Sequence, residues 1–116
     1  MSECCGEKNR VIYACSGASN VGEISDHIAR KLRDENYGKM SCLSGIGADL
    51  SGYVETARGA DECLIIDGCP VQCGRKIFEK HTIKGRFVVL SDFSLEKGKT
   101  PVTQEVVAQM CEKIRG

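Results

Sequence analysis

"VIYACSGASNVGEI", residues 11–24, joins an apolar run, a loop of small residues and the start of a helical pattern. The apolar run belongs to a predicted strand over residues 10–15, which ends on Cys15. Asn20 precedes Glu23 by three residues, an Asn variant of the capping box that marks a helix start. The stretch therefore predicts one strand–loop–helix unit, because apolar residues then recur at helical spacing, at Val21, Ile24, Ile28 and Leu32.

The same alternation of strand and helix recurs along the rest of the chain. Apolar runs predict strands at residues 39–43, 62–67 and 86–90. Helical spacing and punctuation predict three further helices between and after these strands: one ended by Gly59, one from Pro70 to about His81, and a last one with Val106, Val107, Met110, Cys111 and Ile114 on its apolar face.

Strands that alternate with helices and look buried on both faces are typical of a parallel sheet. Right-handed crossovers reduce the possible strand orders mainly to one that resembles flavodoxin, 2-1-3-4. We therefore expect a single α/β domain over residues 10–116, with a four-stranded parallel sheet and helices on both faces. Residues 1–9 are expected to form a flexible tail.

Length and charge limit the classes of function. At 116 residues the chain is long enough for one buried core. Sixteen basic and sixteen acidic residues cancel, which disfavours nucleic acid as a partner. No apolar run is long enough to span a membrane, and the charged N-terminus lacks a signal peptide, so we expect a cytoplasmic protein.

Cysteine is the residue type that stands out, with eight in the chain. In a reducing compartment thiols more often bind metal or catalyse than form disulfides. Four of them come at or just after the ends of predicted strands: Cys15, Cys42, Cys69 and Cys73.

The carboxyl ends of parallel strands meet at one edge of the sheet, where neighbouring strands are about 4.8 Å apart. Cys73 is expected one helical turn beyond Cys69 on the same helix face. Four thiolates at such spacing suit one zinc ion, so the sequence predicts a zinc site with Cys15, Cys42, Cys69 and Cys73 as ligands. If all four bind, no position is left for an activated water. This favours metal handling, sensing or a structural role over catalysis, with the ion and an unidentified protein as partners.

The competing interpretation is that cysteines are small buried hydrophobic residues. That interpretation is preferred for Cys63, inside a predicted strand, and for Cys111, on the apolar face of the last helix. Cys4 and Cys5 are adjacent in the predicted tail, where they either capture a thiophilic metal or have no role.

Other chemistries at the same loop are weaker or remain open. The loop after Cys15 has neither a dinucleotide-binding glycine pattern nor a P-loop lysine, and it lacks the arginine of a thiol phosphatase. A redox or transfer enzyme that uses Cys15 or Cys69 as nucleophile remains an alternative. So does an iron–sulfur protein, since four thiolates also hold such clusters.

Polar residues near the predicted site allow two interpretations each. Asp67 either accepts hydrogen bonds from loop amides and orients the ligand segment or is a turn residue. Asp92 is expected in a turn, and His27 and His81 on helices away from the loops.

Four segments carry a wider resemblance: YACSGASNVGEISDHIARKL, GKMSCLSGIGADLSGY, ADECLIIDGCPVQCGRK and LSDFSLEKG. As a set they closely resemble the DGC-domain family of small zinc-binding proteins, named for the triplet that is here Asp67-Gly68-Cys69. The resemblance covers about residues 10–115. It implies four cysteine ligands, which map onto Cys15, Cys42, Cys69 and Cys73, and it implies no particular reaction.

Overall fold

The computed structural model describes residues 8–116. Five helices, four strands and one 3₁₀ helix follow one another as β1 (Arg10–Ala14), α1 (Asn20–Asp34), β2 (Lys39–Met40), α2 (Leu43–Gly47), α3 (Ser51–Gly59), β3 (Glu62–Asp67), α4 (Cys73–Lys80), β4 (Arg86–Val89), η1 (Leu90–Phe93) and α5 (Gln104–Arg115).

The four strands form one parallel sheet in the order β2-β1-β3-β4, as the sequence predicts. The central pair, β1 and β3, is in register over five residue pairs, from Arg10 with Glu62 to Ala14 with Ile66. The outer strands are shorter, and β2 contributes only two residues. The core of the sheet is therefore two strands wide, with short strands on either side.

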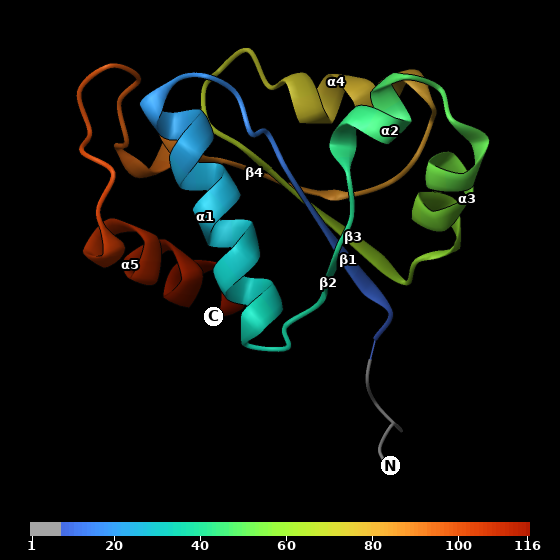
Figure 1. The fold of residues 1–116 in the computed structure, drawn as a ribbon, viewed down its shortest axis with the longest axis horizontal. Helices are drawn as coiled ribbons and strands as arrows, with labels where there is room; N and C mark the ends of the chain where they lie inside the picture. The colour runs from blue at the N-terminus through green and yellow to red at the C-terminus, as the bar shows by residue number, and fades with distance from the viewer. Residues whose placement is uncertain (1–7) are drawn as a thin grey trace.

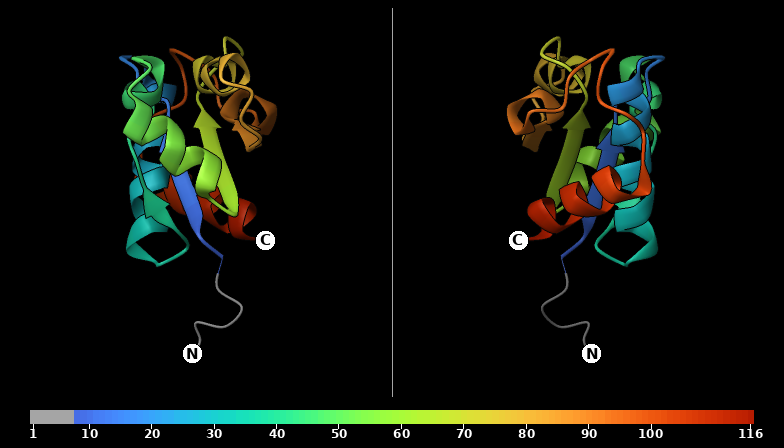
Figure 2. Two further views of the ribbon diagram at one scale, coloured as in Figure 1. Left: turned by 90° about the vertical axis from the view of Figure 1, so that its right-hand side faces the viewer. Right: turned by 90° about the vertical axis from the view of Figure 1, so that its left-hand side faces the viewer.

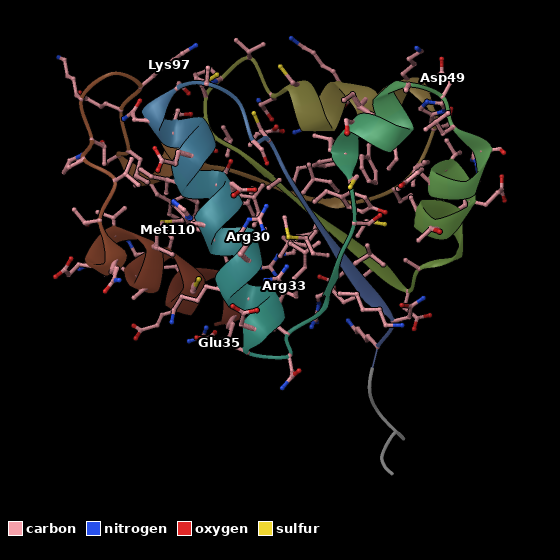
Figure 3. All side chains as sticks on the ribbon, in the orientation of Figure 1. Arg30, Arg33, Glu35, Asp49, Lys97 and Met110 are labelled. Atoms are coloured by element: carbon pink, nitrogen blue, oxygen red, sulfur yellow. The ribbon has the colours of Figure 1, made fainter. Side chains whose placement is uncertain are left out.

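Helices cover both faces of the sheet, again as predicted. On one face α1 and α5 bury Ile12, Leu64 and their neighbours; on the other α2, α3 and α4 bury Tyr13, Ile65 and Phe78. Figure 1 shows these two groups on opposite sides of the strands, and the turned views in Figure 2 look at the sheet through each group in turn, with α3 in front on the left and α5 in front on the right. Met110, labelled in Figure 3, packs in the layer between α5 and the sheet.

The start of α1 differs from the predicted capping box. Ser19 is the N-cap residue, and its hydroxyl accepts a hydrogen bond from Gly22 N (3.1 Å). Asn20 instead ties down the loop before α5: its side-chain amide donates to Glu96 O (3.0 Å) and Thr100 O (2.7 Å), and its oxygen accepts from Gly98 N (2.6 Å). This loop is more than seventy residues away in sequence, so no local pattern reveals the contact.

The segment after β2 also differs from the prediction of a strand over 39–43. The strand ends at Met40, although Ser41 N still donates to Ile12 O (3.1 Å), and α2 begins at Leu43. The helix expected to end at Gly59 is α3, and α2 is a further short helix that the sequence did not predict. Gly45 lets α2 pack closely against α3, since a Cβ there would lie 2.5 Å from the Tyr53 ring.

The third predicted helix begins later than expected. Pro70 lies in a turn, and α4 starts at Cys73 after Gln72, whose φ of 54° is left-handed. The turn is closed by Gln72 N, which donates to Cys69 O (3.0 Å). The prediction that Cys69 and Cys73 share one helix face is therefore wrong.

The carboxyl ends of the strands, and the starts of α1, α2 and α4, lie at the end of the sheet opposite the start of β1 (Figure 1). Of the predicted tail, only Lys8 and Asn9 are described: Asn9 N donates to Asp61 Oδ2 (2.8 Å), and Lys8 Nζ lies 3.3 Å from Glu62 Oε1. Cys4 and Cys5 lie outside the described residues. Within residues 8–116 no helix has the length and apolar character needed to cross a bilayer.

The loop after β3 packs backbone to backbone against the start of α1. A Cβ on Gly68 would lie 2.7 Å from the carbonyl carbon and oxygen of Val21. We expect Gly68→Ala to lower the free energy of unfolding by about 1–3 kcal/mol, because the neighbouring atoms are backbone and cannot rotate away. Urea unfolding of the metal-free protein measures this.

Gly52→Ala is the matched control, since a Cβ on Gly52, in α3, meets nothing within 4 Å. Helix propensity alone predicts a gain of up to about 1 kcal/mol there. Equal destabilisation by both variants would contradict the close packing of Gly68.

Candidate metal centre

The β1–β3 pairing positions Cys15. Its N–H donates to Ile66 O (2.9 Å), which continues the ladder one residue beyond β1 and sets Cys15 beside Asp67. Its carbonyl oxygen is contacted by the hydroxyl of Ser25, a fully buried residue of α1. The following loop curls back, so that a Cβ on Gly17 would lie 3.5 Å from Cys15 Sγ. Cys15 is half-buried and fixed from two sides.

Three of the four predicted ligands belong to the same face of the sheet. Val11 and Tyr13 of β1 pack towards α2, α3 and α4, and strand alternation puts Cys15 on that face as well. Cys42 is the N-cap residue of α2, and Cys73 is the first residue of α4. These two helices pack against each other, since a Cβ on Gly47 would lie 3.3 Å from Ile77 Cδ1.

Cys69 lies at the same edge of the sheet, in the loop after β3. It follows Gly68, which packs against the first turn of α1, and it is half-buried like Cys15. Cys42 and Cys73 are exposed. The four cysteines are therefore brought to one edge of the sheet by three loops, as two half-buried and two exposed thiols.

Asp67 is the buried polar group that organises this edge. Asp67 is only 2% exposed, and its carboxylate accepts hydrogen bonds from Gly74 N (2.8 Å) and Arg75 N (3.0 Å). These are two of the free amides at the start of α4, which otherwise has no side-chain cap. Of the two interpretations of Asp67, the structure bears out the one in which it orients the segment that carries Cys73.

The described side chains do not form a ready-made ion site. Among residues 8–116 no three Cys, His, Asp or Glu side chains are gathered closely enough to hold a metal ion. The donors at the edge suit zinc by type and by the strands they follow, whereas their present spacing does not. The arrangement of the described side chains would therefore have to change before an ion could be held.

The remaining described cysteines belong to the core. Cys63 donates to Ala57 O (3.3 Å), and Cys111 lies under α1 with no exposed surface. Burial raises the pKa of each thiol to about 11, from 9.0. Both are packing residues, as predicted.

The structure adds polar contacts that the sequence did not reveal. Ser16 Oγ donates to Asp26 Oδ1 (2.8 Å), which connects the loop after Cys15 to α1. Although partial burial acts in the opposite direction, hydrogen bonds from Arg30 and Ser16 and the charge of Arg30 hold the pKa of Asp26 below its ordinary value. A serine and an aspartate ten positions apart give no recognisable sequence signal.

Both histidines lie on or beside helices, away from the bases of the cysteine loops. His27 pairs with Glu23 on the surface of α1. His81, which ends α4, donates from Nε2 to Ile46 O (3.1 Å) and lies 2.9 Å from Asp49 Oδ1, so it holds α2 against α4. Asp49, labelled in Figure 3, lies in the segment between α2 and α3.

Comparison with known proteins now identifies the family. The family model of the DGC domain matches residues 11–114, nearly the whole described chain. The chain belongs to the DGC-domain family. It is 34% identical over 88 residues to the "Anaerobic and virulence modulator AnvM" of Pseudomonas aeruginosa, a match that covers 75% of this chain and 67% of that protein. No solved structure matches the chain.

In this DGC-domain protein, Asp67→Asn tests the role of the buried carboxylate. The amide keeps one acceptor oxygen and presents an NH₂ group to the second backbone N–H, which leaves buried donors unpaired. We expect a loss of about 1–3 kcal/mol in the free energy of unfolding. Asp92→Asn is the control, because Asp92 is exposed and its replacement is expected to change stability by less than about 0.5 kcal/mol. A neutral Asp67→Asn would refute this role.

Thiol reactivity tests the division of the cysteines into buried core residues and exposed candidate ligands. Because the thiolate is the reactive form, we expect Cys63 and Cys111 to resist alkylation of the folded, metal-free protein at pH 8, while Cys42 and Cys73 react first. Peptide mass mapping after short exposure to iodoacetamide measures the order.

The same two buried thiols predict alkaline instability. Their pKa is higher in the folded than in the unfolded chain, so the folded state retains its protons longer as pH rises. We expect the free energy of unfolding to fall as pH rises through the interval from 9.0 to about 11. Denaturation at a series of pH values measures this, and Cys111→Ala should reduce the slope.

Proposed function

We propose that this DGC-domain protein is a cytoplasmic zinc-binding protein that holds one ion through Cys15, Cys42, Cys69 and Cys73. The observation that carries the proposal is that three separate loops bring four thiols to one edge of the sheet. Four cysteine thiolates form a donor set suited to tetrahedral zinc.

The energy of metal binding is sufficient to gather the thiols. Fixing a side chain costs at most about 2 kcal/mol of rotamer entropy, and less for a side chain as short as cysteine. A structural zinc site binds its ion with about 10–16 kcal/mol near pH 7. Ordering four short side chains therefore consumes only part of the binding free energy.

The position of the site favours metal handling or sensing over a purely structural role. Both faces of the sheet have continuous apolar cores, so folding does not depend on an ion at the edge. Four protein ligands would leave no open position for an activated water, which disfavours hydrolytic catalysis. The relative AnvM is named a modulator, and a regulatory role for this chain agrees with that name.

A thiol-based redox or transfer enzyme is the second candidate function. The observation in its favour is the turn from Cys69 to Cys73, which leads into a helix held by the buried carboxylate of Asp67. An iron–sulfur protein is the third, and a brown colour after anaerobic purification would identify it.

Elemental analysis with thiol counting on anaerobically purified protein tests the three functions together. We expect about one zinc per chain and four thiols protected from alkylation. No metal, together with a disulfide between Cys69 and Cys73 or between Cys15 and Cys69, would replace the proposal by the redox enzyme.

Two cysteine variants test the ligand set. Cys73→Ser is expected to weaken zinc binding by at least about 100-fold, because a neutral hydroxyl replaces a thiolate ligand. Cys111→Ser is the control: its hydroxyl keeps the position from which Cys111 Sγ contacts Ile28 O, and zinc binding should not change. Competition with a chromogenic chelator measures both affinities, and equal effects would contradict the division.

A further inference from the structure

We propose that Cys69 and Cys73 form a site of reversible oxidation, at which a hydroperoxide converts the two thiols into a disulfide within the loop between β3 and α4. The inference rests on the geometry of this loop and needs no bound ion. It separates these two cysteines from Cys15 and Cys42, which lie in other loops.

The backbone between the two cysteines forms a short closed loop. Gln72 N donates a hydrogen bond to Cys69 O (3.0 Å), and Gln72 itself is left-handed, with a φ of 54°. A hydrogen-bonded turn followed by a left-handed residue is the usual form of a three-residue loop between paired strands. The three residues here are 70–72, so Cys69 and Cys73 are the two residues that flank the loop.

The residues that flank such a loop face each other across it. Opposed residues in paired strands have Cα atoms about 4.5–5.5 Å apart. A disulfide joins residues whose Cα atoms are separated by about 4.4–6.8 Å. We therefore expect Cys69 and Cys73 to form a disulfide by rotation of their side chains, without rearrangement of the backbone.

Both ends of the loop are held by glycines that have no room for a side chain. A Cβ on Gly68 would lie 2.7 Å from the backbone of Val21, and a Cβ on Gly74 would lie 2.7 Å from Ile65 Cγ2. Gly74 N also donates to the buried carboxylate of Asp67 (2.8 Å). The chain is therefore fixed immediately before the first cysteine and immediately after the second, which keeps the two thiols together.

The two thiols differ in their access to solvent. Cys73 is exposed and Cys69 is half-buried, and Figure 1 shows the loop between β3 and α4 at the outer edge of the fold. Oxidation by a small peroxide begins at an accessible thiol. Cys73 is therefore the residue that meets the peroxide, and Cys69 is the residue that completes the disulfide. Cys42 is also exposed, but its loop contains no second cysteine.

The reaction balances with hydrogen peroxide as the oxidant. The sulfur of Cys73 bonds to one peroxide oxygen, the O–O bond breaks, and the departing oxygen leaves as water with the thiol proton of Cys73. The sulfur of Cys69 then bonds to that of Cys73, and the S–O bond breaks. The second water leaves with the thiol proton of Cys69. Two thiols lose two electrons in total, and the peroxide gains them.

Oxidation of this pair has a consequence for the proposed function. Cys69 and Cys73 are two of the four ligands proposed for zinc, so the disulfide would remove both from the ligand set. This consequence rests on the proposed function, whereas the disulfide itself does not. Protein purified without oxygen should keep both residues as thiols.

Peptide mapping tests the proposal on the full chain, first reduced and freed of metal and then treated with hydrogen peroxide. Trypsin and a protease that cleaves before aspartate release residues 67–75, which contain Cys69 and Cys73 and no other cysteine. We expect this peptide to lose the mass of two hydrogen atoms and to regain it with dithiothreitol. A disulfide from either residue to Cys15, or oxidation of Cys42 while this peptide keeps both thiols, would overturn the proposal.

Serine variants test the order of the two steps. Cys69→Ser should leave Cys73 as a sulfenic acid, which dimedone traps, and Cys73→Ser should leave Cys69 reduced. Cys42→Ser is the control, because it removes the other exposed thiol and should form the disulfide at the unaltered rate. Loss of the disulfide in Cys42→Ser, or a sulfenic acid at Cys69 instead of Cys73, would overturn the proposal.

Two replacements of Gln72 test the role of the turn. Proline cannot adopt a positive φ and has no N–H to donate to Cys69 O, so Gln72→Pro should slow disulfide formation by at least about tenfold. Glycine adopts the left-handed conformation readily, so Gln72→Gly should keep the rate. Equal rates in both variants, each shown by circular dichroism to be folded, would overturn the proposal. Because every measurement uses the metal-free chain, failure to bind zinc would refute only the proposed function.

Discussion

The in-register pairing of β1 with β3 is the constraint on which the rest of the structure depends. It runs from Arg10 with Glu62 to Ala14 with Ile66 and continues through the bond from Cys15 N to Ile66 O. Strand side chains alternate between faces, so a slip of one residue would turn every side chain of β1 to the opposite face. Cys15 would then leave the face that α2 and α4 cover. The same pairing sets Asp67 beside Cys15 and delivers Gly68 to the first turn of α1, which fixes the two loops against each other.

The parts of the fold that the sequence predicts are those coded by local periodicity. The run RVIYA and the run ECLIID are apolar enough to identify the two central strands, and the helical spacing from Val21 to Leu32 identifies α1. The strand order then follows from the handedness of crossover connections, which is a property of all such chains. Because the order fixes where strands end, it also places Cys15 and Cys69 at the same edge. The existence of a cysteine-rich edge is therefore predictable from sequence.

The parts that the sequence does not predict are decided by contacts distant along the chain. The start of α4 moves from Pro70 to Cys73 because the buried carboxylate of Asp67 binds the amides of Gly74 and Arg75, and because Gln72 adopts a left-handed conformation. The start of α1 moves to a Ser19 cap because the side chain of Asn20 is engaged by residues 96–100. Strand topology fixes Cα positions to about the spacing of neighbouring strands, whereas a zinc site requires sulfur positions within a few tenths of an ångström. The spacing of the four thiols is therefore the feature that sequence reasoning could locate only coarsely.

The exposure of each cysteine separates those that serve as packing residues from those whose thiols are open to solvent. A cysteine that serves as a small hydrophobic residue should be buried, and Cys63 and Cys111 meet that expectation. Cys42 and Cys73 do not, since both lie in contact with solvent at the starts of helices where they fill no part of either core. A serine at either position would present a similar shape to water without the reactivity of a thiol. Packing therefore accounts for the two buried cysteines and fails for the exposed pair. This exposed pair belongs to the ligand set proposed for zinc, in which the affinity of sulfur for soft metal ions would give both thiols a role.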